Sequence, residues 1–323
     1  MIATRPLLAV DGLSVEYASD RGPVRAVDGV SFQLAAGEFL GIVGESGCGK
    51  STLLFAIARL LTPPAAVAGG RVELKGRDLL AMDEEALREI RWRDYSLVMQ
   101  SAMNALNPVL TVGEQLQDTI AAHEAASPAK SRQRSARLLR LVGIDPIHLK
   151  SYPHQLSGGM RQRAMIAMAL VFTPELVIMD EPTSALDVVA QRALMLQIKE
   201  LQRSIGFAVI FVTHDMSLVS HFSDRLAVMY AGQIVELGAT RELFDEPRHP
   251  YTRALMQSFP SIVGPRQELQ GIPGTPPDLA HPPAGCRFAP RCPLVEPRFR
   301  VEPPPLVSIG TSVVRCHRYG REH

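Results

Sequence analysis

A glycine-rich segment ending in lysine and serine is the part of this chain best suited to chemistry. Residues 44–51 fit the pattern Gly-x4-Gly-Lys-Ser and follow an apolar run at 39–43. The glycines let backbone N–H groups face a phosphate chain, Lys50 reaches the terminal phosphates and the Ser51 hydroxyl holds a magnesium ion. A helical pattern begins at Thr52 and adds its positive N-terminal end. The predicted nucleotide contacts are Gly44, Ser46, Gly47, Cys48, Gly49, Lys50, Ser51 and Thr52.

A second group of candidate residues ends an apolar run. Residues 176–179 are Leu-Val-Ile-Met and are followed by Asp180 and Glu181. At the carboxyl end of a buried strand, Asp180 would bind Mg²⁺ directly or through water, and Glu181 would polarise an attacking water. Two solvated acids at a strand end are the alternative, which the upstream phosphate loop disfavours. The sequence therefore predicts hydrolysis of a nucleoside triphosphate such as ATP.

The elements that must position these residues alternate between strands and helices. Alternating apolar residues at 7–15, 30–34 and 72–74 predict an antiparallel β layer beside the nucleotide site. Continuous apolar runs at 176–179 and 208–212 are typical of strands buried on both faces of a parallel sheet. We therefore predict an α/β fold built around the phosphate loop.

Helical patterns dominate two further parts of the chain. Residues 112–123 and 132–142 have helical spacing, with a Ser-Pro break at 127 and 128, and predict a helical insertion at about 101–170. Residues 188–203 have the pattern of an amphipathic helix.

The last part of the chain has a different composition. Prolines are frequent from Pro260 onward, and three of the four cysteines, Cys286, Cys292 and Cys316, fall there. We expect a main domain at 1–259 and a C-terminal extension at 260–323 that is compact or loosely ordered and does not continue the sheet.

Composition narrows the classes of partner. Apolar residues make up 46% of the 323 residues, enough for a large core, and 34 basic residues nearly balance 33 acidic ones, so we expect no nucleic acid partner. The longest apolar runs, such as 164–172, are too short to cross a bilayer, and the N-terminus lacks the apolar core of a signal peptide. We expect a soluble cytosolic chain whose cysteines stay reduced.

Further motifs resemble those of one family over nearly the whole chain, the ATP-binding subunits of ABC transporters. Its most specific motif, the signature Leu-Ser-Gly-Gly-Met, occupies 156–160 and precedes the acidic strand. Other matches fall in the family's order, at the Q-loop glutamine, the D-loop, the switch histidine and the adenine-stacking aromatic residue. The matching residues are Ser157, Gly158 and Gly159 of the signature, Gln100, Asp187, His214 and Tyr17.

The resemblance implies a role for each of these residues. The signature loop acts on the ATP held by the opposite subunit, so that ATP joins two such domains, and Asp187 crosses the interface. His214 donates to the γ-phosphate, Gln100 senses the magnesium ion and the water, and Tyr17 stacks on adenine. Taken singly, each has a structural alternative, such as a core aromatic for Tyr17.

Within the family, several stretches resemble the oligopeptide, dipeptide and nickel import branch, above all His-Pro-Tyr-Thr at 249–252. The branch implies a second, non-identical ATPase subunit, two transmembrane permease subunits, an extracytoplasmic solute-binding protein and a position on the cytoplasmic face of the inner membrane. The helical insertion and the Tyr251 region would suit docking to a membrane subunit.

The cargo implied by this branch is most often a peptide. Oligosaccharide and nickel stay open, because residues 100–108 depart from the usual peptide-importer wording, which has Asp-Pro after the glutamine. A soluble ABC ATPase of translation or DNA repair is the alternative of another class, although the second cassette, coiled coil or zinc insertion typical of such proteins does not appear in the sequence.

The tail resembles an extension in which four cysteines hold an iron–sulfur cluster. The match covers residues 285–293, but the third cysteine of the family would fall at Phe299, which cannot ligate iron. His317 as a further ligand, zinc bound by three cysteines and a histidine, and a metal-free tail held by prolines and apolar packing are the open alternatives. A disulfide is disfavoured in a reducing cytosol.

Overall fold

A computed structural model describes residues 5–20, 22–100, 105–184, 186–258 and 271–320. The chain divides into two compact units, one made of 1–34, 39–80 and 212–323 and the other of 35–38 and 81–211. Three segments named in the sequence analysis lie outside the described residues. They are residues 101–104 after the Q-loop glutamine, the D-loop position 185 and the start of the proline-rich tail at 260–270.

The first unit contains the predicted antiparallel layer. Its strands are β1 (Leu8–Tyr17), β2 (Val24–Leu34), β4 (Ala65–Leu74) and β5 (Arg77–Asp78), in the order β2-β1-β4-β5. Antiparallel pairing joins β1 to both β2 and β4, as the alternating pattern predicts. Two of the strands are longer than their apolar alternation, because exposed polar and glycine residues extend them.

A second group of strands in this unit carries the phosphate loop. The order is β11 (Leu306–Ile309), β12 (Ser312–Arg315), β10 (Gln233–Ala239), β9 (Arg225–Tyr230) and β3 (Phe39–Val43). Every residue of β3 is buried, and β3 runs parallel to β9. The predicted strand at 39–43 is confirmed.

The expectation that the tail does not continue the sheet is wrong. Strand β12 pairs with β10 in antiparallel fashion, with Val314 opposite Glu236 and Val313 opposite Leu237. The prolines of the tail stop at Pro305, so the segment from Leu306 onward has every backbone N–H available for pairing.

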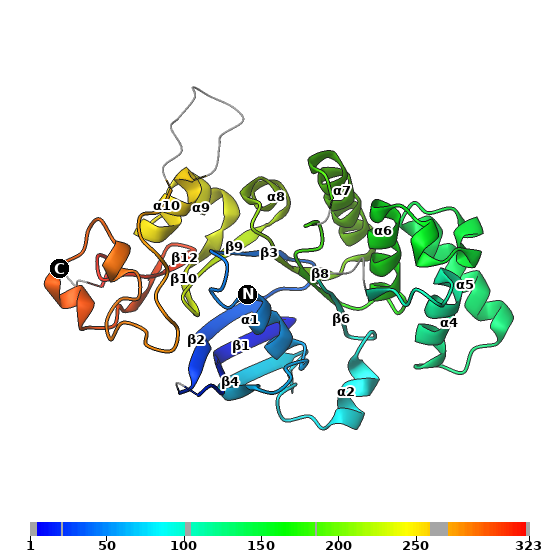
Figure 1. Cartoon of the computed structure of the whole chain (residues 1–323), viewed down its shortest axis with the longest axis horizontal. Helices are drawn as coiled ribbons and strands as arrows, with labels where there is room; N and C mark the ends of the chain where they lie inside the picture. The colour runs from blue at the N-terminus through cyan, green and yellow to red at the C-terminus, as the bar shows by residue number, and fades with distance from the viewer. Residues whose placement is uncertain (1–4, 21, 101–104, 185, 259–270, 321–323) are drawn as a thin grey trace. The chain divides into compact units, whose positions relative to one another are not determined.

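Short helices complete the first unit. They are α1 (Lys50–Ile57), α8 (Met216–Phe222), α9 (Thr240–Asp245), α10 (Pro250–Gln257), η3 (Ala289–Arg291) and η4 (Pro297–Arg300). Helix α1 packs against β1 and β2, as Figure 1 shows.

The second unit has its own strands and most of the long helices. Its elements are α2 (Glu84–Ile90), β6 (Tyr95–Val98), α4 (Val112–Ala121), α5 (Pro128–Leu141), η1 (Pro146–Lys150), η2 (Pro153–Gln155), α6 (Gly158–Ala169), β7 (Leu176–Asp180), α7 (Val188–Ile205) and β8 (Ala208–Val212). The strand order is β8-β7-β6, with β6 parallel to β7. Because β7 and β8 are buried at every residue, they match the continuous apolar runs.

Helices α4, α5 and α6 pack together in the part of the chain where helical spacing was expected (Figure 1). Ser127 accepts a hydrogen bond from Lys130 N, and Pro128 occupies the first turn of α5. The Ser-Pro pair is therefore a helix start, because the capping side chain and the fixed φ of proline both favour that position. Among the described residues, none of the helices combines the length and apolar character that crossing a bilayer requires.

Candidate active site

The phosphate loop connects β3 to α1 and is packed tightly from behind. Gly44 has φ 154° and Gly49 has φ 104°. A Cβ atom would lie 2.2 Å from Met229 O at Gly44 and 2.1 Å from Ala26 O at Gly49. No side chain fits at either position, so both glycines are required by this loop. No side chain caps α1, which leaves its first N–H groups able to bind a phosphate.

The Lys50 ammonium lies inside the loop. The residue is buried, and Nζ donates to Gly44 O at 2.7 Å and to Glu45 O at 3.0 Å. Ser46 and Gly47 form the exposed tip of the loop. A lysine ammonium held by the carbonyl oxygens of a phosphate loop is placed to contact the terminal phosphates of a nucleotide.

Tyr17 and Thr52 lie together at the start of α1, with Tyr17 Oη 3.1 Å from Thr52 Oγ1. This places the predicted adenine-stacking ring beside the phosphate loop. Cys48 is buried, and burial raises the pKa of its thiol. It is a small neutral residue that fits behind the loop, as the sequence predicts for that variable position.

The first unit also contains the candidate switch histidine, His214. His214 lies two residues after Val212, the end of β8, and is exposed. The next residue, Asp215, caps α8 by accepting from Ser217 N at 2.8 Å, which fixes the backbone directly after the histidine.

The acidic pair ends β7 in the second unit. Asp180 is buried, and Glu181 has φ 45°, in the left-handed region that non-glycine residues rarely adopt. Gln100 Nε2 donates to Glu181 Oε2 at 2.7 Å. Backbone strain of this kind costs about 1–3 kcal/mol and is concentrated at functional sites. The structure thus brings together Gln100, which is expected to sense the magnesium ion and the water, and Glu181, which is expected to polarise that water.

The signature loop begins α6. Ser157 is the N-cap, and its Oγ accepts from Met160 N at 3.3 Å. Gly158 and Gly159 form the first turn, and a Cβ at Gly159 would meet no atom within 4 Å. The space beside Gly159 at the start of α6 is therefore open, as binding of a phosphate there would require.

Asp187 caps α7 by accepting from Ala190 N at 2.8 Å. Gln191 Nε2 donates to Thr183 O and Leu186 O, each at 3.0 Å, and so fixes the D-loop. Sequence reasoning missed Gln191, whose contacts are with backbone atoms and leave no motif.

The predicted site residues thus fall into two groups. The first unit holds Tyr17, His214 and the phosphate loop, and the second holds Gln100, Asp180, Glu181, Asp187 and the signature loop. The candidate magnesium ligands are Ser51, Asp180 and Gln100, all of which offer oxygen donors. Mg²⁺ prefers oxygen ligands, so each of these side chains is chemically able to bind it.

Tyr251 is a further residue that contacts the phosphate loop. Its side chain is 0% exposed, and its hydroxyl accepts a hydrogen bond from Glu45 N at 2.9 Å. The Tyr251 side chain therefore supports the phosphate loop, and docking of the surrounding region to a membrane subunit stays a prediction. His249 caps α10 through Nδ1, which accepts from Tyr251 N, and so turns the tyrosine inward.

The cysteines of the tail line one small cavity, of about 10 Å³. Such a space holds about one water molecule. The Phe299 ring stacks on His317 at 4.5 Å between ring centres. Burial raises the pKa of Cys286 to about 11, and it raises the pKa values of Cys292 and Cys316 too.

No group of three or more potential ligands in the described part of the chain is arranged to hold a metal ion. His317 also has another partner, since its Nε2 lies 2.9 Å from Glu302 O. The described part of the tail therefore gives no support to an iron–sulfur cluster or a zinc ion.

Comparison with known proteins gives a consistent result. The ABC transporter family model matches residues 27–184, and the model for the oligopeptide/dipeptide transporter C-terminal region matches 235–298. The chain is 48% identical to "Dipeptide transport ATP-binding protein DppD" of Bacillus subtilis over 89% of this chain and 87% of that protein. It is 44% identical to the "Oligopeptide transport ATP-binding protein OppD" of the same organism over 98% of this chain and 89% of that protein.

Solved structures agree with the fold. The ATP-binding cassette MJ0796, bound to ADP and phosphate in a post-hydrolysis state, matches with a TM-score of 0.65 and 29% identity, over 72% of this chain and 99% of that one. The fold and the motif residues define an ABC-type ATP-binding cassette. The chain belongs to the ATP-binding subunits of ABC transporters, in their oligopeptide/dipeptide branch, and is an ATP-hydrolysing transporter subunit.

Proposed function

We propose that this chain hydrolyses ATP to drive import of dipeptides or oligopeptides through a membrane ABC transporter. The observation that carries the proposal is the 48% identity to a dipeptide transport ATP-binding protein over 89% of the chain. The intact phosphate loop, acidic strand and signature support hydrolysis as the energy source.

In this proposal, the phosphate loop and the acidic strand bind the nucleotide. Lys50 contacts the terminal phosphates, and Tyr17 stacks on adenine. Ser51 and Asp180 would hold Mg²⁺, with Gln100 as a further oxygen donor. When bound, the ion neutralises charge on the phosphates.

Glu181 is the proposed base that polarises the attacking water. Its hydrogen bond from Gln100 supports this role, because the amide fixes the direction of the carboxylate. His214 is the proposed donor to the γ-phosphate. Removal of a proton from the water and stabilisation of the departing phosphate thus fall to residues of this chain.

We also propose that two cassettes complete each ATP site. The open helix start at Gly158 and Gly159 would contact the ATP held by the partner, and Asp187 would line the interface. The partner is a second, non-identical ATPase subunit, and ATP binding closes the pair.

The proposed assembly includes two transmembrane permease subunits and an extracytoplasmic solute-binding protein, with this chain on the cytoplasmic face of the inner membrane. We assign residues 1–259 to the ATPase domain, with its helical insertion at about 101–170, and residues 260–323 to a C-terminal extension. For that extension we propose a metal-free role, supported by the Phe299–His317 stack at the cysteine-lined cavity.

Affinity purification from detergent-solubilised membranes of the native host tests this proposal. We expect two permease subunits, a second ATPase and a peptide-specific binding protein to copurify. A binding protein specific for sugars or nickel would contradict the peptide cargo. Ribosomal or DNA-repair partners without permease subunits would contradict transport altogether.

A further inference from the structure

The C-terminal tail contacts the phosphate loop directly through one arginine. Arg291 Nη1 donates to Glu45 Oε2 at 2.7 Å, and Nη2 donates to Glu45 Oε1 at 2.9 Å. Glu45 is the second residue of the loop, between Gly44 and the exposed tip. A two-pronged bond between guanidinium and carboxylate fixes direction as well as distance.

Arg291 is itself held firmly. Its side chain is only 3% exposed. Nε donates to Pro273 O at 2.8 Å, Nη2 to Ile272 O at 3.2 Å, and Nη1 to Tyr230 Oη at 3.3 Å. The guanidinium therefore joins an earlier segment of the tail and strand β9 to the loop, and its position does not depend on Glu45 alone.

Glu45 is held at each of its polar groups. Its carboxylate binds Arg291, its N–H donates to Tyr251 Oη at 2.9 Å, and its carbonyl accepts from Lys50 Nζ at 3.0 Å. A ring cluster supports the tyrosine, since the Tyr251 ring centre lies 4.5 Å from that of Tyr230 and 5.5 Å from that of Phe288. The backbone beside Lys50 is thus fixed by side chains from outside the loop.

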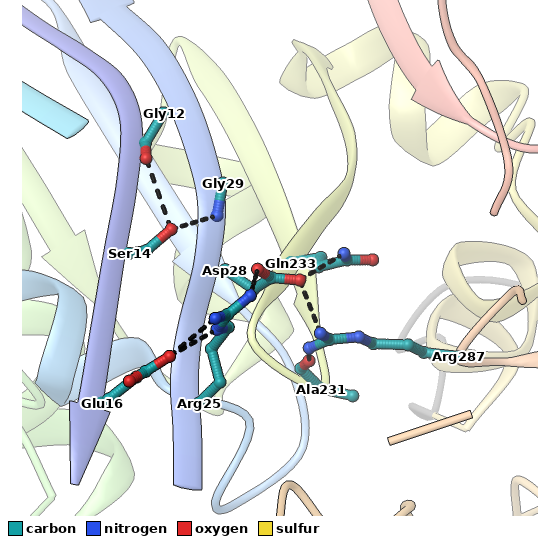
Figure 2. A network of polar contacts seen from close by, with 9 residues as sticks. All are labelled: Gly12, Ser14, Glu16, Arg25, Asp28, Gly29, Ala231, Gln233 and Arg287. Carbon is teal, nitrogen blue, oxygen red and sulfur yellow. Dashed lines mark hydrogen bonds and ion pairs between the residues drawn. The ribbon is translucent and has the colours of Figure 1, made fainter. Parts of the chain in front are cut away.

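A second arginine of the tail, Arg287, binds the turn between β9 and β10, and this turn contacts the phosphate loop. Figure 2 shows Arg287 bound to Asp28 and to Ala231 O. The next residue, Gly232, donates to Cys48 O at 2.9 Å and accepts from Asp28 N at 2.9 Å. Arg287 therefore supports the loop only indirectly, whereas Arg291 binds a loop residue itself.

We propose that Arg291 is a positioning residue for ATP binding, through which the C-terminal tail holds the phosphate loop in its binding shape by way of Glu45. A preformed loop loses less conformational entropy when the phosphates bind, so its affinity for nucleotide is higher. This inference rests on the proposed use of the Lys50 loop for ATP.

The test measures binding of a fluorescent ATP analogue and steady-state ATP turnover in the assembled transporter. We expect Arg291→Ala to raise the Kd and the KM for ATP about 10-fold and to change kcat by less than about 2-fold, because the loop still reaches the same geometry once ATP is bound. Arg291→Lys keeps the positive charge but cannot form the two-pronged bond to the carboxylate. Its KM for ATP should lie between those of the wild type and Arg291→Ala.

Arg298→Ala is the matched control. It removes the same charge from the same tail, but Arg298 pairs with Glu296 of the tail itself, at 3.2 Å, and lies over the Phe299 ring. We expect its KM to equal that of the wild type. An equal rise in KM for Arg298→Ala and Arg291→Ala would contradict the inference, because a general loss of tail stability would then explain both.

A double-mutant cycle tests whether Arg291 acts through Glu45. If it does, Arg291→Ala raises KM no further in a Glu45→Ala background. Additive effects, or an unchanged KM in Arg291→Ala, would overturn the proposal. If Arg291→Ala does not assemble, Arg291→Lys and Glu45→Gln carry the same cycle.

Lys50→Ala separates the two possible failures. Loss of binding in Lys50→Ala with no effect of Arg291→Ala rejects only the positioning role. Unchanged binding in Lys50→Ala rejects the ATP site itself.

Discussion

The phosphate loop and the cysteine-lined cavity of the tail both lie in the first unit, and both match a family pattern in sequence. In the loop, the surrounding structure meets the chemical requirements of the pattern: Gly49 fits against the carbonyl of Ala26, and the Lys50 ammonium is held by the carbonyl of Gly44. At the cavity, Phe299 stands where the pattern requires a ligand, and the space is about 10 Å³. A pattern predicts function only where each position keeps the physical property that the function needs.

The largest expected effect comes from Glu181→Gln. The amide can no longer accept a proton from water, so we expect ATP turnover to fall by about 10³-fold while ATP binding is retained and a closed ATP-bound pair accumulates. Turnover in the purified transporter and nucleotide retained on gel filtration check both parts. Near-normal turnover would show that another residue acts as the base.

Lys50→Ala should weaken binding at the loop. Removing the buried ammonium takes away the charge that contacts the terminal phosphates, and we expect ATP affinity to fall by about 10²-fold, with ADP affected less. Titration with the two nucleotides measures the difference. Equal losses for ATP and ADP would contradict a contact to the terminal phosphate.

The two regions also differ in what the sequence could predict about them. Strand β3 and helix α1 were predicted well because the pattern of each is local. Strands β11 and β12 were missed because the many prolines before Leu306 suggested an irregular segment. The pairing of Arg291 with Glu45 joins residues 246 positions apart, and no local pattern reports such a contact.

The buried histidine beside the loop region adds a pH dependence to the first unit. Burial lowers the pKa of His249 to about 3, so between pH 6.5 and about 3 the unfolded chain binds a proton that the folded chain excludes. Stability should therefore fall by about 1.4 kcal/mol per pH unit as the pH drops below 6.5. Burial raises the pKa of neighbouring Glu236, which acts in the opposite direction as that carboxylate takes up its proton.

His249→Asn is the matched variant for this prediction, because asparagine also caps a helix but does not titrate. Denaturant unfolding at several pH values should give a shallower acid slope for the variant than for the wild type. The same slope in both proteins would assign the acid sensitivity to other groups.

A substitution at Phe299 tests whether the missing ligand is what prevents the tail from binding a cluster. We expect wild-type protein reconstituted anaerobically with iron and sulfide to show no cluster absorption band. Phe299→Cys supplies the missing thiol and removes the ring that stacks on His317, so we expect a partial band in that variant. A full cluster in the wild-type protein would show that the described packing rearranges to admit it.

The most direct test of peptide import is ATP turnover by the transporter reconstituted in lipid vesicles, with and without its peptide-loaded binding protein. We predict that the loaded binding protein raises turnover severalfold, and that Glu181→Gln abolishes this increase. Turnover that ignores peptide, or that rises only with a sugar-loaded or nickel-loaded binding protein, would contradict the peptide assignment.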